Sequence, residues 1–191
     1  MSTNSREAVR QAARRRAQAH GCNGLNFRDL AAEVGARSAS LHSYFLSKAA
    51  LGAAVTRRHW DDSAAELEAL RRDTPDPKDC LSRYPDLGRR SLASDNRMCL
   101  CPFMAAVHDD LPPAVVAEVD RFADVSIAWL AERLAETGMS SQAAPDHAGG
   151  IFAAIAGTRL MARERADIEL FDRLIQGCRD AGLLPPRAHR S

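Results

Sequence analysis

Polar and apolar residues follow one another along this chain with the spacing of helical turns. The pattern is clearest after Asn26, where apolar residues recur at intervals of three and four positions. These apolar residues are Phe27, Leu30, Ala31 and Val34. Asn26 is a good N-cap for the short amphipathic helix that they predict. Gly35 stands where this helix has to end, because a left-handed residue after a helix costs little without a Cβ.

Similar patterns predict helices over most of the chain, whereas no alternating run of Val, Ile and Thr predicts a strand. The predicted helices span about residues 5–20, 27–34, 38–45, 48–72, 78–94, 113–137, 145–163 and 167–179, with a shorter one starting at Pro102. Pro75 and Pro77 separate two of them, and Pro85 with Gly88 predicts a kink or an interruption. The fold class is therefore predicted to be all-α.

The two short helices at 27–34 and 38–45 are joined by a turn that contains Gly35. In the second helix Leu41 and Phe45 are four residues apart and are predicted to face inward. Two short helices joined in this way are typical of a helix-turn-helix, whose second helix enters the DNA major groove. We therefore expect a DNA-binding head here, although many all-α proteins contain a short helical hairpin.

The segment that follows adds a second signal. Ser47 is a good N-cap, which places Lys48 at the first position of the next helix. A cation there opposes the helix dipole unless something negative shares the site. A DNA phosphate, bound by the terminal amides and the ammonium group together, is one interpretation. A solvated surface lysine is the other.

Residues 6–60 resemble the tetracycline-repressor (TetR/AcrR) family of bacterial transcriptional regulators. The positions in register with the family pattern are Phe27, Leu30, Ala31, Gly35, Leu41, Phe45, Ser47, Lys48 and Leu51. The chain departs from the pattern at Ser38, Ala39, His42 and Leu46, which stand where the family often has Lys, Gly, Tyr and Pro. We expect these changes to alter base preference rather than the fold.

The resemblance implies that residues around Arg37 to Tyr44 meet the groove, and that Lys48 and the start of helix two touch the DNA backbone. The predicted DNA-binding residues are Arg28, Arg37, Ser38, Ser40, His42, Ser43, Tyr44 and Lys48. Residues 1–50 are accordingly predicted to form the DNA-binding domain. Residues 51–191 are predicted to form a helical domain for effector binding and dimerisation.

The distribution of charge agrees with a head that binds DNA. The net charge of the chain is only +1, but residues 1–60 contain ten Lys and Arg against three acids, and the remainder carries −6. A basic end on an acidic body is typical of DNA binding by one end. Part of the basic charge is the run Arg14, Arg15 and Arg16, for which phosphate contact and a simple solvated face are both open.

For the body, the resemblance implies a ligand cavity between helices. The candidate lining residues are Phe103, Met104, Val107, His108, Phe122, Trp129 and Phe152. Each of these residue types is also common in an ordinary core. The group His108, Asp109 and Asp110 precedes two prolines, so we expect it to end one helix and lead into the next rather than to form a metal or catalytic cluster.

The last two helices are predicted to dimerise, as the corresponding pair does in the family. Small residues at three- and four-residue spacings allow helices to approach closely, and an apolar stripe follows on the final helix. The predicted interface residues are Gly150, Ala153, Ala154, Gly157, Phe171, Leu174 and Ile175. Packing within one subunit is the alternative.

Cys99 and Cys101 lie just before Pro102, which is predicted to take the first position of a helix. A thiol at a helix N-terminus has a lowered pKa, so this pair suggests redox or electrophile sensing. Simple packing of the cysteines is an alternative, and so is a soft metal, although no second cysteine pair lies nearby and no metal site is predicted.

The sequence therefore predicts a homodimeric, cytoplasmic transcriptional regulator that binds palindromic operator DNA and responds to a small-molecule effector. A repressor is expected, with no cofactor, no membrane partner and no enzymatic activity. There is no signal-peptide pattern and no apolar run of membrane-spanning length. A thiol-based regulator using Cys99 and Cys101 is an alternative. So is a constitutive DNA-binding protein without an effector.

Overall fold

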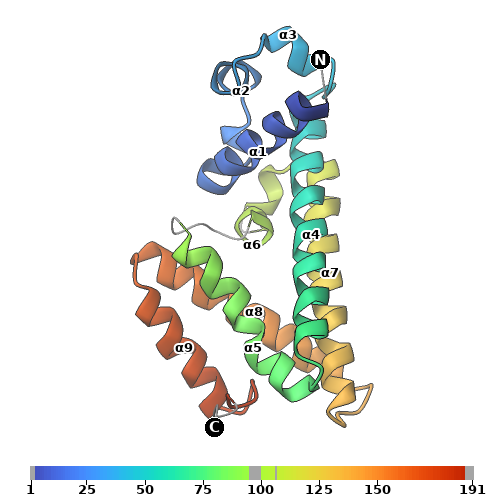
Figure 1. The fold of residues 1–191 in the computed structure, drawn as a ribbon, viewed down its shortest axis with the longest axis vertical. Helices are drawn as coiled ribbons and strands as arrows, with labels where there is room; N and C mark the ends of the chain where they lie inside the picture. The colour runs from blue at the N-terminus through green and yellow to red at the C-terminus, as the bar shows by residue number, and fades with distance from the viewer. Residues whose placement is uncertain (1–2, 95–99, 106, 188–191) are drawn as a thin grey trace. The chain divides into compact units, whose positions relative to one another are not determined.

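A computed structural model of the chain describes residues 3–94, 100–105 and 107–187 (Figure 1). The described residues form helices and connecting turns without strands, which confirms the predicted all-α class. The elements are α1 (Thr3–His20), η1 (Gly21–Gly24), α2 (Phe27–Glu33), α3 (Ser38–His42), α4 (Lys48–Asp73), α5 (Pro77–Ala93), α6 (Leu100–Ala105), η2 (His108–Asp110), α7 (Pro113–Glu136), α8 (Ala144–Glu164) and α9 (Ile168–Asp180). None of the described helices combines the length and the apolar character that a membrane span requires.

The chain packs into two compact units. The first comprises Met1–Asp62 and Leu100–Phe122, and the second comprises Ser63–Cys99 and Ala123–Ser191. Helices α4 and α7 each contribute residues to both units. These are units of packing, and the functional boundary expected at residue 50 stays a prediction.

The first unit has a core of small and branched side chains around the helix-turn-helix. Its buried apolar residues include Val9, Ala12, Ala13, Ala17, Leu25, Leu30, Ala31, Leu41, Phe45, Leu51, Val55, Met104 and Val115. Helix α4 is joined to α6 by the buried Thr56, whose hydroxyl donates to the Gly52 carbonyl at 2.9 Å and lies 3.5 Å from Met104 Sδ. The predicted inward positions of α1, α2 and α3 thus hold the head together.

The second unit has a larger core, formed where α5, α8 and α9 pack together and completed by α7. Its buried residues include Leu67, Cys80, Leu81, Trp129, Leu130, Leu134, Ile151, Ile155, Phe171 and Ile175. Helix α5 runs without interruption through Pro85, although the sequence predicted a kink or break there. Gly88 allows a close approach, because a Cβ at this position would lie 2.9 Å from Arg159 Cδ.

Three other local predictions need correction. Helix α3 ends at His42, not Phe45, because Ser43 begins a tight turn in which the Tyr44 amide donates to the Leu41 carbonyl at 3.0 Å. Leu100 and Cys101 already belong to the described part of α6, so Pro102 is not its first residue. His108, Asp109 and Asp110 form a 3-10 turn of their own and do not end a helix.

Candidate nucleic-acid interface

Helix α2 is fixed at both ends by residues that the sequence singled out. The side-chain oxygen of Asn26 accepts from the amides of Arg28 at 2.8 Å and Asp29 at 3.4 Å, which confirms the N-cap. Gly35 has φ of +65°, the left-handed conformation predicted after the helix end. These two local signals set the length and direction of the first helix of the motif.

Helix α3 is anchored by Leu41 and Phe45, both buried as predicted. The other side chains of α3, Ser40 and His42 among them, are exposed or half-buried, and Ser43 just after the helix is exposed. The His42 ring packs edge-on against Phe27 with 4.5 Å between ring centroids. This contact ties α3 to α2 and places His42 at the join of the two helices.

Helix α4 begins at Lys48, directly after its cap. The Ser47 hydroxyl oxygen accepts from the Ala50 amide at 3.1 Å, which confirms the predicted capping role. Lys48 is exposed at the first helical position. The arrangement leaves the Lys48 ammonium group beside the positive end of the α4 dipole, a combination that favours an anion.

The arginine run of α1 is held by acids of the first unit. Arg14 donates to Asp62 at 2.7 Å and to His59 Nδ1 at 3.1 Å. Arg15 and Arg16 donate to the two carboxylate oxygens of Glu33 at 2.9 and 2.8 Å. Arginines in such pairs are less available to phosphate than the sequence alone suggested.

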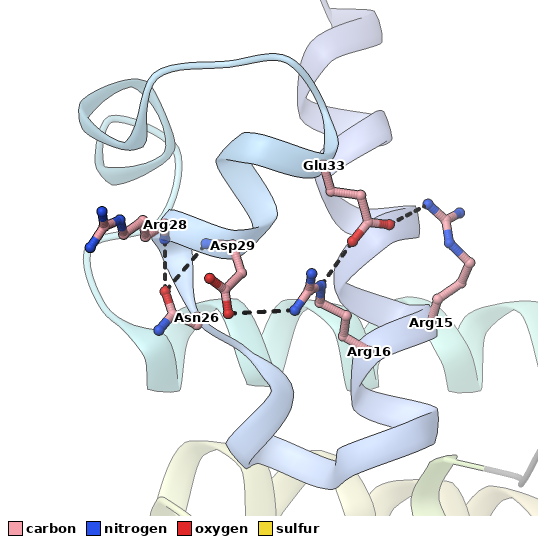
Figure 2. A network of polar contacts seen from close by, with 6 residues as sticks. All are labelled: Arg15, Arg16, Asn26, Arg28, Asp29 and Glu33. Atoms are coloured by element: carbon pink, nitrogen blue, oxygen red, sulfur yellow. Dashed lines mark hydrogen bonds and ion pairs between the residues drawn. The ribbon is translucent and has the colours of Figure 1, made fainter.

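Figure 2 shows the contacts of Arg15 and Arg16 along α2, from Asp29 in its first turn to Glu33 at its end. Arg16 also lies 3.5 Å from Asp29, so it bridges both acids of α2. The side chain of Arg28 points away from the network, while its backbone amide is held by Asn26. Glu33 was not singled out from the sequence, since its arginine partners lie 17 and 18 residues away, beyond any local pattern.

Three cations of the helix-turn-helix have no carboxylate partner among the residues that the structure describes. They are Arg28 at the start of α2, Arg37 before α3, and Lys48 at the start of α4, all exposed. By contrast, Arg57 pairs with Glu118 and Arg58 with Asp62. The unpaired positive charge therefore lies at the helix starts of the motif, which is where phosphates bind.

The Glu33 network gives a testable dependence on pH. Hydrogen bonds from Arg16, and next from Arg15, lower the pKa of Glu33 from its ordinary value of 4.5. A lowered folded-state pKa means that the stabilisation is present above this ordinary value and is lost as the pH falls through the lowered pKa. We expect Glu33→Gln to reduce the free energy of unfolding by less than about 1 kcal/mol at neutral pH, because the pair is largely exposed.

Urea unfolding of native protein and Glu33→Gln across an acid pH series measures this effect. The difference between the two proteins is expected to shrink towards zero at low pH. Glu66→Gln is the matched control, because Glu66 is exposed on α4 and has no ion pair among the described residues. A difference that stays constant with pH, or appears equally in the control, would contradict the role given to Glu33.

The predicted ligand-lining residues are distributed over both units. Met104 and Phe122 are buried in the first, where the Phe122 ring stacks on His59 at 5.8 Å between centroids. Val107 and His108 are exposed there, and the His108 ring lies 3.4 Å from Asp109. Trp129 is buried in the core of the second unit, and Phe152 is partly buried and packs against that core. The Phe103 side chain lies outside the description, and a cavity lined by these residues stays a prediction.

The predicted dimer residues divide into two groups. Phe171 and Ile175 are buried in the core of their own chain, where a partner can reach them only if that core repacks. Ala153 and Gly157 are exposed on α8, while Gly150, Ala154 and Leu174 are half-buried. Leu160 and Met161, also on α8, are large apolar residues outside its buried stripe. They are 47% and 42% exposed.

Of the two cysteines Cys99 and Cys101, the structure describes only Cys101. Cys101 lies within α6 and is 1% exposed, so oxidants reach its thiol only if the fold opens. Cys99 lies outside the described residues, so thiol sensing stays a prediction. Within the described part of the chain, no three His, Cys, Asp or Glu side chains gather as metal ligands.

Comparisons with known proteins agree with this geometry. Residues 9–55 match the family model "Bacterial regulatory proteins, tetR family". A TetR transcriptional regulator from Legionella pneumophila is 26% identical, with a TM-score of 0.85 over 95% of this chain and 97% of that one. A TetR-family regulator from Agrobacterium tumefaciens is 24% identical, with a TM-score of 0.86 over 93% and 97%.

A more distant structure is that of FadR from Bacillus subtilis in complex with stearoyl-CoA. It is 14% identical, with a TM-score of 0.70 over 89% of this chain and 95% of that one, which shows the fold alone. A comparison with curated proteins finds no match.

Proposed function

This chain belongs to the TetR family of bacterial transcriptional regulators, and we propose that it binds palindromic operator DNA as a homodimer and leaves it when a small-molecule effector binds. The observation that carries the proposal is the set of unpaired cations at the helix starts of the head. Arg28, Arg37 and Lys48 are exposed without carboxylate partners among the described residues. Phosphates of a DNA backbone match three cations placed in this way.

The side chains between these cations provide base contacts. Helix α3 is short, and its exposed or half-buried residues include Ser38, Ser40 and His42. Serine hydroxyls donate or accept at several base edges, and histidine contributes a ring nitrogen. The phosphate contacts of Arg28, Arg37 and Lys48 set the register in which α3 meets the groove. A regulator of this kind acts by binding DNA and an effector, and this function requires neither catalysis nor a cofactor.

Dimerisation supports the same function, because two heads are needed to read two half-sites about 34–36 Å apart. The surface proposed for it is the outer face of α8, formed by Ala153, Gly157, Leu160 and Met161. These residues are exposed and lie on one side of the helix at spacings of three and four. A Cβ at Gly157 would meet no atom within 4 Å, so a second helix can approach closely there.

We expect Leu160→Asp to raise the dimer dissociation constant at least about 30-fold, as loss of a central apolar contact does. Sedimentation equilibrium measures the change. Leu46→Asp is the matched control, since Leu46 is exposed in the head and lies far along the chain from α8. A dimer that is equally stable in both variants would place the interface elsewhere.

The effector part of the proposal is supported by the family and by the FadR complex, whose fold this chain shares. A ligand that fits the body of the DNA-free state better than that of the bound state shifts the population off the operator. Location in the cytoplasm, where operator DNA lies, follows from the same proposal.

The deciding experiment measures binding to duplex DNA from immediately upstream of the protein's own gene. Fluorescence anisotropy is recorded at two salt concentrations, with a shuffled duplex of the same composition as control. Tight binding that is selective for the native duplex and weakens with salt is the expected result. Equal affinity for both duplexes would rule out sequence-specific binding to this operator. Binding to neither would overturn the proposal.

A further inference from the structure

The second unit contains an open groove between α5 and α9 with an accessible volume of about 670 Å³. The two helices lie side by side within this unit (Figure 1). None of the ligand-lining residues predicted from the sequence belongs to the groove. Its size falls within the range of small-molecule sites, which is roughly 300–1,000 Å³.

The groove has an apolar base and a positively charged rim. Pro85, Ala93, Phe171 and Ile175 supply the apolar part. The charged residues are Asp86, Arg89, Arg90, Asp172, Arg179 and Arg187, which together give a net charge of +2. A mixed surface of this kind suits a ligand with an apolar body and an anionic group.

Both aspartates are already neutralised within the groove. Arg89 donates to the two oxygens of Asp172 at 2.8 and 2.9 Å, a bidentate pair that joins α5 to α9. Arg187 donates to Asp86. The excess positive charge therefore belongs to the remaining two arginines, Arg90 and Arg179, which have no carboxylate within ion-pair distance among the described residues.

Arg179 is an incompletely satisfied cation. One guanidinium nitrogen donates to the Ser82 carbonyl at 3.0 Å, but its buried Nε has no hydrogen-bond partner in the structure. Burial, and next the nearby Arg187, lower the pKa of Arg179 from its ordinary value. An anion placed beside the Arg179 guanidinium would relieve the repulsion between Arg179 and Arg187.

We propose that the α5–α9 groove binds an organic oxyanion, a carboxylate or phosphate on a small apolar body, through Arg90 and Arg179. The consequence, that the bound anion acts as the effector, rests on the proposed function. The apolar body lies against Phe171 and Ile175, and the oxyanion lies between the two guanidinium groups.

Isothermal titration calorimetry on the full-length protein tests the binding step without DNA. The probes are benzoate and phenyl phosphate, which distinguish the two anions, together with benzyl alcohol and inorganic phosphate, which each lack one half of the ligand. We expect at least one aromatic anion to bind more tightly than either half-ligand. No binding of either anion, or equal binding of benzyl alcohol, would overturn the proposal.

Substitutions then locate the site. Arg90→Gln is expected to weaken binding of the better anion about tenfold, the effect of one charge-assisted hydrogen bond. Arg90 is exposed, so this variant is expected to fold, whereas Arg179→Lys tests the half-buried Arg179 while keeping its charge. Arg165→Gln is the matched control, because Arg165 is exposed on the second unit outside the groove. Equal weakening in the control would show non-specific charge attraction and would contradict the site.

The effector role is tested separately by adding the better anion to the protein–operator complex. If the anion releases the native protein from DNA but not the Arg90→Gln variant, the effector role is supported. If the anion binds the native protein without releasing it from DNA, the effector role is overturned. A protein that binds the anion but no DNA would refute the regulator and leave the calorimetric result intact. The two proposals can therefore fail independently.

Discussion

Leu41→Ala is expected to lower the free energy of unfolding by about 2–5 kcal/mol, the cost of truncating a fully buried leucine. Leu41 is 0% exposed and anchors the five-residue helix α3 to the rest of the head. A helix this short has little stability of its own, so the packing of its single buried leucine decides whether it forms. Because α3 carries the predicted base-reading side chains, sequence-selective DNA binding is expected to fall with it.

Urea denaturation at one fixed protein concentration measures the change, since the stability of a dimer depends on concentration. Leu46→Ala is the matched control: it removes the same atoms five positions later in the same head, from a side chain that is 92% exposed. We expect the control to change stability by no more than about 0.5 kcal/mol. Comparable losses in both variants would mean that α3 is not held in place by Leu41.

Local signals account for the parts of the head that the sequence predicted well. The caps at Asn26 and Ser47 and the stop at Gly35 involve residues within three or four positions of each other, so a short pattern is enough to find them. The length of α3 was overestimated because the turn after Ser43 is stabilised by bonds between neighbouring backbone groups, which hydrophobic spacing does not reveal.

Contacts between distant segments were not predictable in the same way. Glu33 holds Arg15 and Arg16 across a turn, and Asp172 holds Arg89 across 83 positions of sequence. Such pairs depend on how helices pack, which one sequence does not give. The same holds for the α5–α9 groove, whose residues have ordinary surface character until α5 and α9 lie together.

Residue type was a weak guide to a ligand site for a related reason. Met104, Phe122 and Trp129 are large apolar residues, and they are buried, as is usual for such side chains in a core. Burial alone does not separate a packed side chain from one that lines a cavity. The α5–α9 groove differs in having arginines without a carboxylate partner among the described residues, which only the folded chain reveals.

Replacing Arg28, Arg37 and Lys48 together by alanine is expected to have the largest effect on DNA binding. The proposed phosphate contacts number three in each head and therefore six in the proposed dimer. At about 1 kcal/mol for each contact, the affinity falls roughly 10⁴-fold. The slope of log affinity against log salt is expected to fall by about 5, because each phosphate contact contributes about 0.9.

Fluorescence anisotropy on the operator duplex over a series of salt concentrations measures both quantities. The matched control replaces Arg72, Lys78 and Arg165 by alanine, which removes the same charge from three exposed positions of the second unit. If net charge alone governed binding, the two triple variants would lose equal affinity, and the contacts assigned to the head would be wrong. A lower affinity with an unchanged salt slope would instead mean that the three cations act on the shape of the head without touching phosphate. Loss of both affinity and slope in the head variant alone requires direct contact, because only released counterions change the slope.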